Sequence, residues 1–543
     1  MRRALLPAVV LAAAVTLEAQ VGFDRILNAD AEPYNWLSYS RTLSNQRFSP
    51  LAQITTANVT DLELAWVWQT RSLEKFEATP LVVDGILYTV QAPNDVVALD
   101  AVTGRPFWTF PYEPAPEGRP CCGRVNRGLA ILGDTLYMGT IDAHLLAIDA
   151  HSGELRWKVK VAEAAERYSI THSPTVVRDK VIVGTGGGDG PIRGLIAAYD
   201  AHTGEEVWRF RTIPGPGEFG NDTWSGDSWR TGGVGVWNAA AYDPETNLIF
   251  YGTGNPAPDW DGSVRLGDNL YSNSVVALDA DTGELRWYYQ FTPHDEMDYD
   301  STQVPLLADL TWRGEPRKVM LWANRNGLMY VLDRVTGDFL FGKPYVKVNW
   351  MDGFDSNGRP NRVRVGTPEG TLIQPHVHGA SNWAPPAFSP RTGLYYVSHW
   401  ENTGSIAFEG AFPQTLPGNR RQTTMGQVNL QPFYNTPDEA YGVIRAYDPD
   451  TLEPAWEHRM ADITWGGVLA TAGDLVFGGG KEGYFLALDA RTGDLLWRAS
   501  VGGQINSGPM SYAVDGRQYV AVAAGSALFT FALPEQTRSP QTP

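Results

Sequence analysis

Short apolar stretches, each closed by a turn signature, recur along the chain at intervals of roughly 40 to 50 residues. The recurring phrase reads apolar–x–Asp–x–x–Thr/Ser–Gly–x–x–x–Trp, as in AIDAHSGELRW, which ends at Trp157. Weaker copies end at Phe341 and Trp456, and only the last part of the phrase precedes Trp66. The eight units end at Trp66, Trp108, Trp157, Trp208, Trp287, Phe341, Trp456 and Trp497.

Each unit predicts two antiparallel strands joined by a tight turn. An apolar strand ends at the Asp, whose carboxylate can accept hydrogen bonds from the turn, and the Gly supplies a positive φ. The next strand is expected to carry the Trp into the core. Short antiparallel strands at this period are typical of a β-propeller. The predicted fold class is therefore all-β: an eight-bladed β-propeller with functional loops inserted between blades.

The intervals between units differ in length, and two of them, 209–286 and 342–455, contain large insertions. Insertions on a regular scaffold commonly carry function. Because no other composition shift divides the chain, we assign residues 20–535 to one eight-bladed propeller domain and residues 536–543 to a flexible tail.

The chain begins MRRALLPAVVLAAAVTLEAQ, a short basic region followed by the apolar run 4–17. That run is shorter than the about 20 residues that a spanning helix needs. The pattern is typical of a secretory signal peptide, residues 1–19, cleaved after Ala19. An N-terminal membrane anchor is the alternative. Export predicts an oxidising, periplasmic location.

Composition narrows the function further. The chain has 61 acidic and 43 basic residues and a formal charge of −18, which argues against a nucleic-acid partner. Beyond the signal, no segment of 18 uncharged apolar residues follows, so no membrane span is expected after its removal. The two cysteines, Cys121 and Cys122, are adjacent and cannot form a Cys-x-x-Cys-His haem motif or a four-thiolate zinc site. They form either a strained disulfide ring or two reduced core cysteines.

An acidic segment, FTPHDEMDYDST at 291–302, carries Asp295, Glu296, Asp298 and Asp300. On a strand, Asp298 and Asp300 would face the same side. Like charges that close repel one another unless a cation neutralises them or one is protonated. The segment therefore indicates a site for a hard cation with oxygen ligands. A solvated acidic loop is the alternative.

Three further segments place polar residues next to glycine. Asn255 lies in YGTGNPAPDW, Arg325 in NRNGLMYVLDR, and Asp189 at the end of GTGGGD. The glycine-rich segment is not a P-loop, because no Gly-Lys-Ser/Thr follows it. It is not a dinucleotide-binding fingerprint either, because no βαβ unit surrounds it.

Taken together, PCCGRVNRG, GDNLYSNSVVALDADTGELRW, TPHDEMDYD and RNGLMYVLDR resemble motifs of the PQQ-dependent (pyrroloquinoline quinone, quinoprotein) alcohol dehydrogenases of the methanol and ethanol dehydrogenase type. The similarity extends over essentially the whole mature chain, from NWLSYSRTLSNQRFSPL to the last unit. The resemblance implies PQQ and one metal ion as cofactors. It also implies oxidation of a primary or related small alcohol to an aldehyde, with hydride transfer to C5 of PQQ.

The resemblance also implies roles for individual residues. Asp298 corresponds to the catalytic base, and Arg325 to the arginine beside the reactive carbonyls. Trp237 takes the position that stacks on one face of the quinone, and a Cys121–Cys122 disulfide would form the other face. The residues implied in cofactor binding are Glu77, Cys121, Cys122, Arg127, Thr171, Gly187, Gly188, Trp237, Arg325, Asn382 and Trp465. The implied metal ligands are Asp189, Asn255, Asp298 and Asp300.

Two of these positions separate the chain from a calcium-using relative. Asp189 stands where the family has a glutamate, and its carboxylate is about 1.5 Å shorter in reach unless the adjacent glycines let the loop move inward. Asp300 is an additional aspartate that resembles the lanthanide-using branch, and a trivalent ion compensates one more carboxylate. We therefore expect a lanthanide ion, with Ca²⁺ as the second candidate.

The expected partners are a small alcohol substrate and an external acceptor for the electrons, a periplasmic cytochrome c. For the oligomeric state, the sequence is compatible with a homodimer as well as with a monomer. A non-catalytic periplasmic propeller that acts as an assembly scaffold is the alternative function. That alternative explains the eight repeats but not the adjacent cysteines, Trp237 or the paired aspartates.

Overall fold

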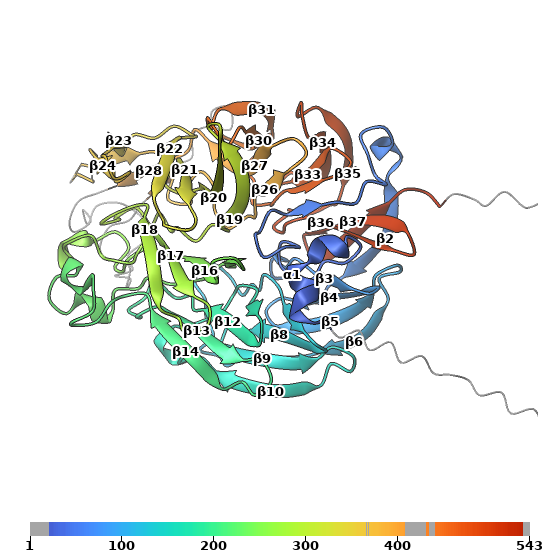
Figure 1. The fold of residues 1–543 in the computed structure, drawn as a ribbon, viewed down its shortest axis with the longest axis horizontal. Helices are drawn as coiled ribbons and strands as arrows, with labels where there is room; N and C mark the ends of the chain where they lie inside the picture. The colour runs from blue at the N-terminus through green and yellow to red at the C-terminus, as the bar shows by residue number, and fades with distance from the viewer. Residues whose placement is uncertain (1–20, 365, 368, 408–430, 434–439, 536–543) are drawn as a thin grey trace, which may run out of the picture.

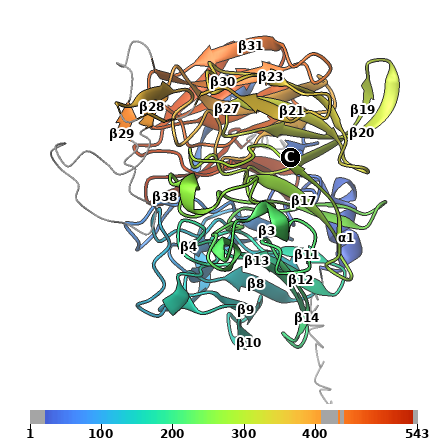
Figure 2. The same cartoon turned by 90° about the vertical axis from the view of Figure 1, so that its left-hand side faces the viewer.

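A computed structural model describes residues 21–364, 366–367, 369–407, 431–433 and 440–535. The expected signal peptide (1–19) and tail (536–543) lie outside the described residues. Eight blades, each with four antiparallel strands, stand around a ring (Figure 1), and one of them has a fifth, parallel strand; this is the predicted eight-bladed β-propeller. Figure 2, turned by 90°, shows blades 2 and 6 on opposite sides of it.

From the inner to the outer strand, the first four blades are β3 (Leu81–Val83), β4 (Ile86–Gln91), β5 (Asp95–Asp100), β6 (Pro106–Phe110); β7 (Ala130–Leu132), β8 (Thr135–Gly139), β9 (His144–Asp149), β10 (Leu155–Lys160); β11 (Thr175–Val177), β12 (Lys180–Gly184), β13 (Leu195–Asp200), β14 (Glu206–Arg211); and β15 (Ala241–Asp243), β16 (Leu248–Gly252), β17 (Ser274–Asp279), β18 (Leu285–Gln290). The last four are β19 (Leu306–Trp312), β20 (Glu315–Ala323), β21 (Leu328–Asp333), β22 (Phe339–Pro344); β26 (Ala387–Ser389), β27 (Leu394–Glu401), β30 (Tyr441–Tyr447), β31 (Pro454–Arg459); β32 (Leu469–Thr471), β33 (Leu475–Gly479), β34 (Tyr484–Asp489), β35 (Leu495–Ser500); and β36 (Met510–Val514), β37 (Arg517–Ala524), β38 (Ala527–Ala532), β2 (Glu63–Gln69).

The ring is closed by strands from both ends of the chain. β2, from the N-terminal part, pairs antiparallel with β38 as the outer strand of blade 8, and β1 (Phe48–Ser49) adds in parallel to the inner strand of blade 7. Backbone N–H groups of Tyr242, Leu307 and Phe388 donate to carbonyls of residues 43–46. The N-terminal segment therefore runs across the inner strands of successive blades and ties them together.

The remaining elements are short. The insertion 342–455 adds a sheet of β23 (Met351–Phe354) and β24 (Pro360–Arg362), and a sheet of β25 (Thr371–Ile373), β28 (Gly404–Ala407) and β29 (Gln431–Phe433). The helical elements are α1 (Phe23–Leu27) and the 3-10 turns η1 (Ala29–Ala31), η2 (Val59–Asp61), η3 (Ala164–Glu166), η4 (Asn221–Thr223), η5 (Ser228–Arg230) and η6 (Gly262–Val264). Within the described residues, no helix has the length and apolar character needed to cross a membrane.

The repeated phrase folds locally as expected. Asp149 ends the third strand of blade 2, and its Oδ1 accepts from the backbone N–H groups of His151 (2.9 Å) and Ser152 (2.8 Å). Gly153 follows with φ +76°. The same bonds recur at the corresponding aspartates, for example Asp279 in blade 4. These contacts span only a few residues, so the local sequence is sufficient to specify them.

The expectation that the tryptophans of the phrase enter the core is confirmed for Trp66, Trp208 and Trp456, which are buried in hydrophobic clusters, and the other four are partly buried against such clusters. Each of the seven lies on an outer strand, and all but Trp497 lie close to the turn glycine of the next blade. Trp108 of β6 donates its Nε1–H to the carbonyl of Ala150 (3.2 Å), and a Cβ on Gly153 would meet its ring at 2.6 Å. The glycine thus serves two purposes: it adopts the positive φ and leaves room for the indole.

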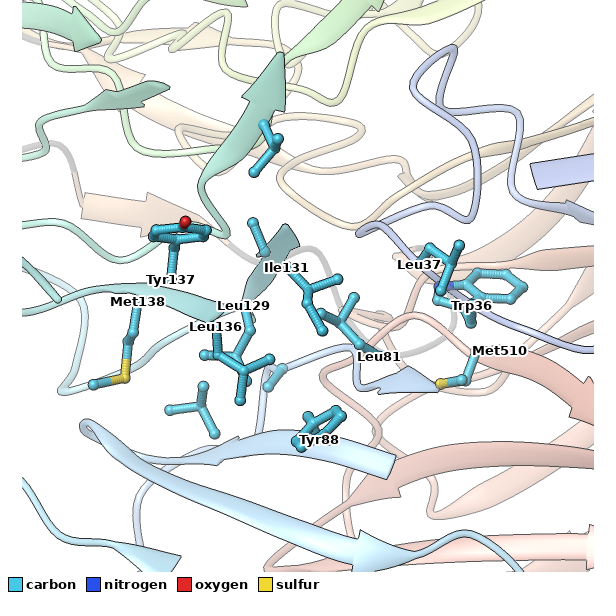
Figure 3. Packing of buried hydrophobic residues seen from close by; sticks show 14 of the residues in the cluster. Trp36, Leu37, Leu81, Tyr88, Leu129, Ile131, Leu136, Tyr137, Met138 and Met510 are labelled. Atoms are coloured by element: carbon cyan, nitrogen blue, oxygen red, sulfur yellow. The ribbon is translucent and has the colours of Figure 1, made fainter. Parts of the chain in front are cut away.

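The core between blades consists of aliphatic and aromatic side chains from inner strands. Leu81 of β3, Ile131 of β7 and Met510 of β36 are all buried in one hydrophobic cluster. Figure 3 shows Leu81 between the other two, so that side chains of blades 1, 2 and 8 pack against one another. This packing holds the inner strand ends at a fixed spacing, and these ends carry the site.

Candidate active site

The site lies at one end of the ring because successive strands of a blade run in opposite directions. In a four-stranded antiparallel blade, the loop between the second and third strands lies at the same end as the connection to the next blade. Every residue that the sequence singled out falls in one of these two kinds of loop. Glu77, Arg127, Trp237 and Asp298 precede inner strands, whereas Asn255 follows a second strand. The Asp–Thr–Gly turns lie at the opposite end.

These loops enclose one cavity of about 440 Å³, a size suited to a small-molecule cofactor. All the sequence-predicted site residues line it: Glu77, Cys121, Cys122, Arg127, Thr171, Gly187, Gly188, Asp189, Trp237, Asn255, Asp298, Asp300, Arg325, Asn382 and Trp465. They come from seven connections between blades and from three loops within blades 3, 4 and 5. The structure thus brings together residues almost 400 positions apart, and their individual roles remain predictions.

The two cysteines form a vicinal disulfide, with Cα atoms 3.8 Å apart. Both residues are exposed and line the cavity. The alternative of two reduced core cysteines is therefore wrong.

A buried ion pair lies deeper in the cavity. Glu77 is 3% exposed, and its Oε2 lies 2.8 Å from a terminal nitrogen of Arg127. Burial raises the pKa of Glu77, while the Arg127 charge opposes that shift. Arg127 also donates to Thr171 Oγ1 (3.1 Å), and its guanidinium carbon lies 5.1 Å from the ring centre of Trp237 and 4.8 Å from that of Trp383. The ion pair therefore fixes the Arg127 guanidinium beside the rings of Trp237 and Trp383 in the cavity wall.

The acidic side of the cavity is organised by Arg325, which is 4% exposed. It donates to Asp300 Oδ2 at 2.6 Å and to Asp298 Oδ2 at 2.9 Å. The other oxygen of Asp300 accepts the backbone N–H of Asn255 (2.8 Å). The other oxygen of Asp298 is buried and has no hydrogen-bond partner among the described residues. Burial raises the pKa of Asp298, with Arg325 opposing and the Asp300 charge reinforcing the shift.

Two details differ from the sequence-based expectation. Residues 291–305 form an irregular loop between β18 and β19 rather than a strand, and Asp298 adopts φ +56°. Asp298 and Asp300 are nevertheless brought together by Arg325, a contact made through the tertiary fold. Asp295 does not line the cavity but accepts the backbone N–H groups of Met297 and Tyr299, and Glu296 pairs with Arg362 at 2.6 Å. Only two of the four carboxylates therefore belong to the site.

The glycine-rich loop is held by close backbone contacts. A Cβ on Gly188 would lie 2.7 Å from the backbone nitrogen of Gly235, and one on Gly187 would lie 2.2 Å from the carbonyl oxygen of Arg167. Side chains at these positions would push the loop away from the cavity. Asp189 follows directly, and burial together with the Asp300 charge raises its pKa to about 6. Glycine at these two positions therefore lets the loop pack closely against the backbone of Arg167 and Gly235.

The donor set fits a hard cation, although its geometry is not that of a preformed metal site. Among the described residues, no three acidic, histidine or cysteine side chains converge as metal ligands. Yet buried carboxylates that share a site raise one another's pKa, as Asp189, Asp298 and Asp300 do. With Arg325 as the cation that contacts Asp298 and Asp300, an added multivalent ion would neutralise the excess of negative charge.

Several lining residues were missed by the sequence analysis. Trp383, which stacks on Arg127, directly follows the predicted site residue Asn382, so the sequence analysis could have included it. Asp259 lies inside the quoted YGTGNPAPDW segment, four residues after Asn255, and is 1% exposed. The others are far from any motif; they include Lys75, His378 and Asn506. Only the tertiary fold places them beside the cavity.

Comparison with known proteins agrees with this picture. The family described as "Glucose/ethanol/alcohol dehydrogenase, beta-propeller domain" of PQQ proteins matches residues 36–349 and 438–520. The quinohemoprotein alcohol dehydrogenase ADH-IIG of Pseudomonas putida is 39% identical, over 96% of this chain and 77% of the relative. A lanthanide-dependent methanol dehydrogenase of Methylacidiphilum fumariolicum is 36% identical, over 92% of this chain and 86% of the relative.

A solved structure supports the same assignment. A europium-containing methanol dehydrogenase superposes with a TM-score of 0.85 at 32% identity, over 94% of this chain and 100% of the other. The expectation of an enzyme is confirmed, and the scaffold alternative is set aside. The chain belongs to the PQQ-dependent (quinoprotein) alcohol dehydrogenase family.

Proposed function

We propose that the protein oxidises a primary or related small alcohol to an aldehyde, using PQQ and one metal ion held in the cavity. The observation that carries the proposal is the state of Asp298 beside a flat cofactor site. One of its oxygens is fixed by Arg325, and the other is buried without a hydrogen-bond partner among the described residues. An acceptor kept free in this way suits a general base.

The cavity fits a planar, polyanionic cofactor. Trp237 and the Cys121–Cys122 disulfide offer its two faces, and Arg127 and Lys75 offer positive charge. Thr171, Asn382 and Trp465 would complete the contacts. When bound, PQQ supplies a carbonyl carbon, C5, that accepts hydride, and the metal supplies Lewis acidity at that carbonyl.

The protein's own part in the reaction is the handling of the proton. Asp298 accepts the hydroxyl proton of the alcohol on its free Oδ1. Arg325 holds the carboxylate in position through Oδ2, at 2.9 Å, and its own hydrogen bond to the carbonyl of Val377 (2.7 Å) fixes the guanidinium. Burial raises the pKa of Asp298, and a bound cation would oppose that shift and keep the carboxylate ionised, as a general base must be.

We propose a lanthanide as the metal, with Ca²⁺ second. Asp189, Asn255, Asp298 and Asp300 are the ligands proposed from the sequence, and three of them carry a carboxylate. A trivalent ion compensates more of this buried charge than a divalent one. The relatives named as lanthanide-dependent and europium-containing methanol dehydrogenases favour the same choice.

The electrons of the reduced cofactor need an acceptor, and the adjacent cysteines of this sequence do not form a Cys-x-x-Cys-His haem motif. We propose a periplasmic cytochrome c. The net charge of −18 favours a basic partner.

The test is dye-linked alcohol oxidation by metal-free protein reconstituted with PQQ and either La³⁺ or Ca²⁺. Asp298→Asn should retain PQQ, seen by its absorption, and lose about 10²- to 10⁴-fold in turnover. Near-normal turnover in this variant would remove Asp298 as the base. Activity with Ca²⁺ alone would overturn the lanthanide assignment.

A further inference from the structure

Asp259 is a buried carboxylate of the cavity to which no role has been assigned. It lies in the loop between β16 and β17, four residues after Asn255, and is 1% exposed. It lines the same cavity as Asp189, Asp298 and Asp300. The negative charges of these three residues act on it, so the four carboxylates share one electrostatic environment.

Asp259 has no counter-ion among the described residues. No lysine, arginine or histidine nitrogen there forms an ion pair with it, whereas Arg325 pairs with both Asp298 and Asp300. The nearest candidate is Arg265, but its guanidinium donates to the carbonyls of Pro258, Asp259 and Asp295 and to the side chain of Asn269. A carboxylate buried in this way is costly to ionise without a cation beside it, so its geometry suits a site that a metal ion completes.

The one hydrogen bond of the carboxylate points to the same role. Asp259 Oδ1 accepts from Asn255 Nδ2 at 2.8 Å, and Asn255 Nδ2 also lies 3.4 Å from the carbonyl of Pro256. Both bonds engage the amide nitrogen of Asn255 and leave its amide oxygen free for a cation. No hydrogen bond to Asp259 Oδ2 is formed by the described residues, so this oxygen is available as well.

We propose that Asp259 is a further ligand of the metal ion. Its carboxylate compensates for the Asp189 side chain, which is shorter than a glutamate. The inference rests on the proposed function, because it concerns the metal of the same site. Asp189 has a side chain one methylene shorter than a glutamate, about 1.5 Å of reach, and Asp259 adds a second carboxylate from the neighbouring loop. The cavity then offers four carboxylates and the Asn255 amide, a charge that suits a trivalent ion.

The experiment is calorimetric titration of metal-free, PQQ-containing protein with LaCl₃ and with CaCl₂. Asp259→Asn removes the charge at nearly constant shape and should weaken La³⁺ binding by about 10- to 100-fold or more. Asp261→Asn, two residues along the chain and not part of the cavity lining, is the matched control and should stay within about twofold. Equal affinity of Asp259→Asn and the unchanged protein would overturn the proposal.

Two further measurements separate a ligand from a residue that only holds Asn255. Without metal, Asp259→Asn should leave the midpoint of thermal unfolding unchanged, because the amide oxygen of the variant can still accept from Asn255 Nδ2; a purely structural role of the carboxyl group requires a lower midpoint. Adding Asp189→Glu to Asp259→Asn should recover about tenfold in La³⁺ affinity, since the longer arm restores a reaching carboxylate. No recovery would contradict the shared role. Failure of the unchanged protein to bind either metal would overturn the proposed function itself.

Discussion

The contact between a glycine turn and the tryptophan of the preceding blade makes a quantitative prediction. Gly493 lies between β34 and β35 with φ +76°, and a Cβ there would lie 2.5 Å from Cε3 of Trp456. Trp456, on β31 of blade 6, donates its Nε1–H to the carbonyl of Ala490 at 3.0 Å. Gly493→Ala should therefore both strain the turn and displace the indole that joins blades 6 and 7.

The magnitude follows from two separate costs. A left-handed alanine costs about 1–2 kcal/mol relative to glycine. Inserting a methyl group into a packed contact costs about 1–3 kcal/mol more, so the free energy of unfolding should fall by about 2–5 kcal/mol. Gly393→Ala is the matched control, because Gly393 also follows a threonine and has φ +71°, but a Cβ there meets nothing within 4 Å. Gly393→Ala should therefore lower the free energy of unfolding by only the about 1–2 kcal/mol of a left-handed alanine.

The assay is urea unfolding of both variants, or the unfolding rate where refolding fails. Alcohol oxidation per folded molecule should be unchanged in both, because these turns lie at the end of the ring opposite the cavity. Equal losses of stability in Gly493→Ala and Gly393→Ala would refute the argument that the indole sets the requirement for glycine.

Four further predictions follow from other contacts. Leu452 is buried, has φ +55° and stands in place of the turn glycine in the one blade whose preceding blade has Phe341 instead of Trp. Leu452→Gly should leave a cavity and lower the free energy of unfolding by about 1–4 kcal/mol, measured by urea unfolding. Asp300→Ala should shift the La³⁺-to-Ca²⁺ affinity ratio about tenfold toward Ca²⁺ in competition titrations, since one carboxylate is lost. Cys121→Ser should leave the unfolding midpoint within about 2 °C, because the enclosed loop is minimal, yet lower PQQ retention on gel filtration. In metal-free protein, burial raises the pKa of Asp189 to about 6, above its value in the unfolded chain, so the free energy of unfolding should fall as the pH rises from about 4 to 6. Over that range Asp189→Asn should become more stable than the unchanged protein, and bound metal should remove the difference.

The repeat pattern determined the fold because its interactions are local. Asp149 bonds to residues two and three positions along the chain, and Gly153 adopts its positive φ within the same turn. Eight such units specify eight antiparallel blades without any long-range information. The alternation of strands then decides that all connecting loops of interest meet at one end. The repeats could therefore predict the architecture, whereas the resemblance to a known family supplied most of the residues that line the cavity.

The tertiary structure alone decided how these residues meet. Arg325 binds Asp298 and Asp300 across about 25 positions of chain, although their segment is a loop and not the strand that the spacing suggested. The tryptophans dock on the next blade, a contact that no single unit contains. Asp259 was only one acidic residue in a quoted segment until the fold buried it without a counter-ion. Local sequence specifies turns and strands, whereas burial, counter-ions and contacts between blades depend on loops that are distant in the chain and converge only in the closed ring.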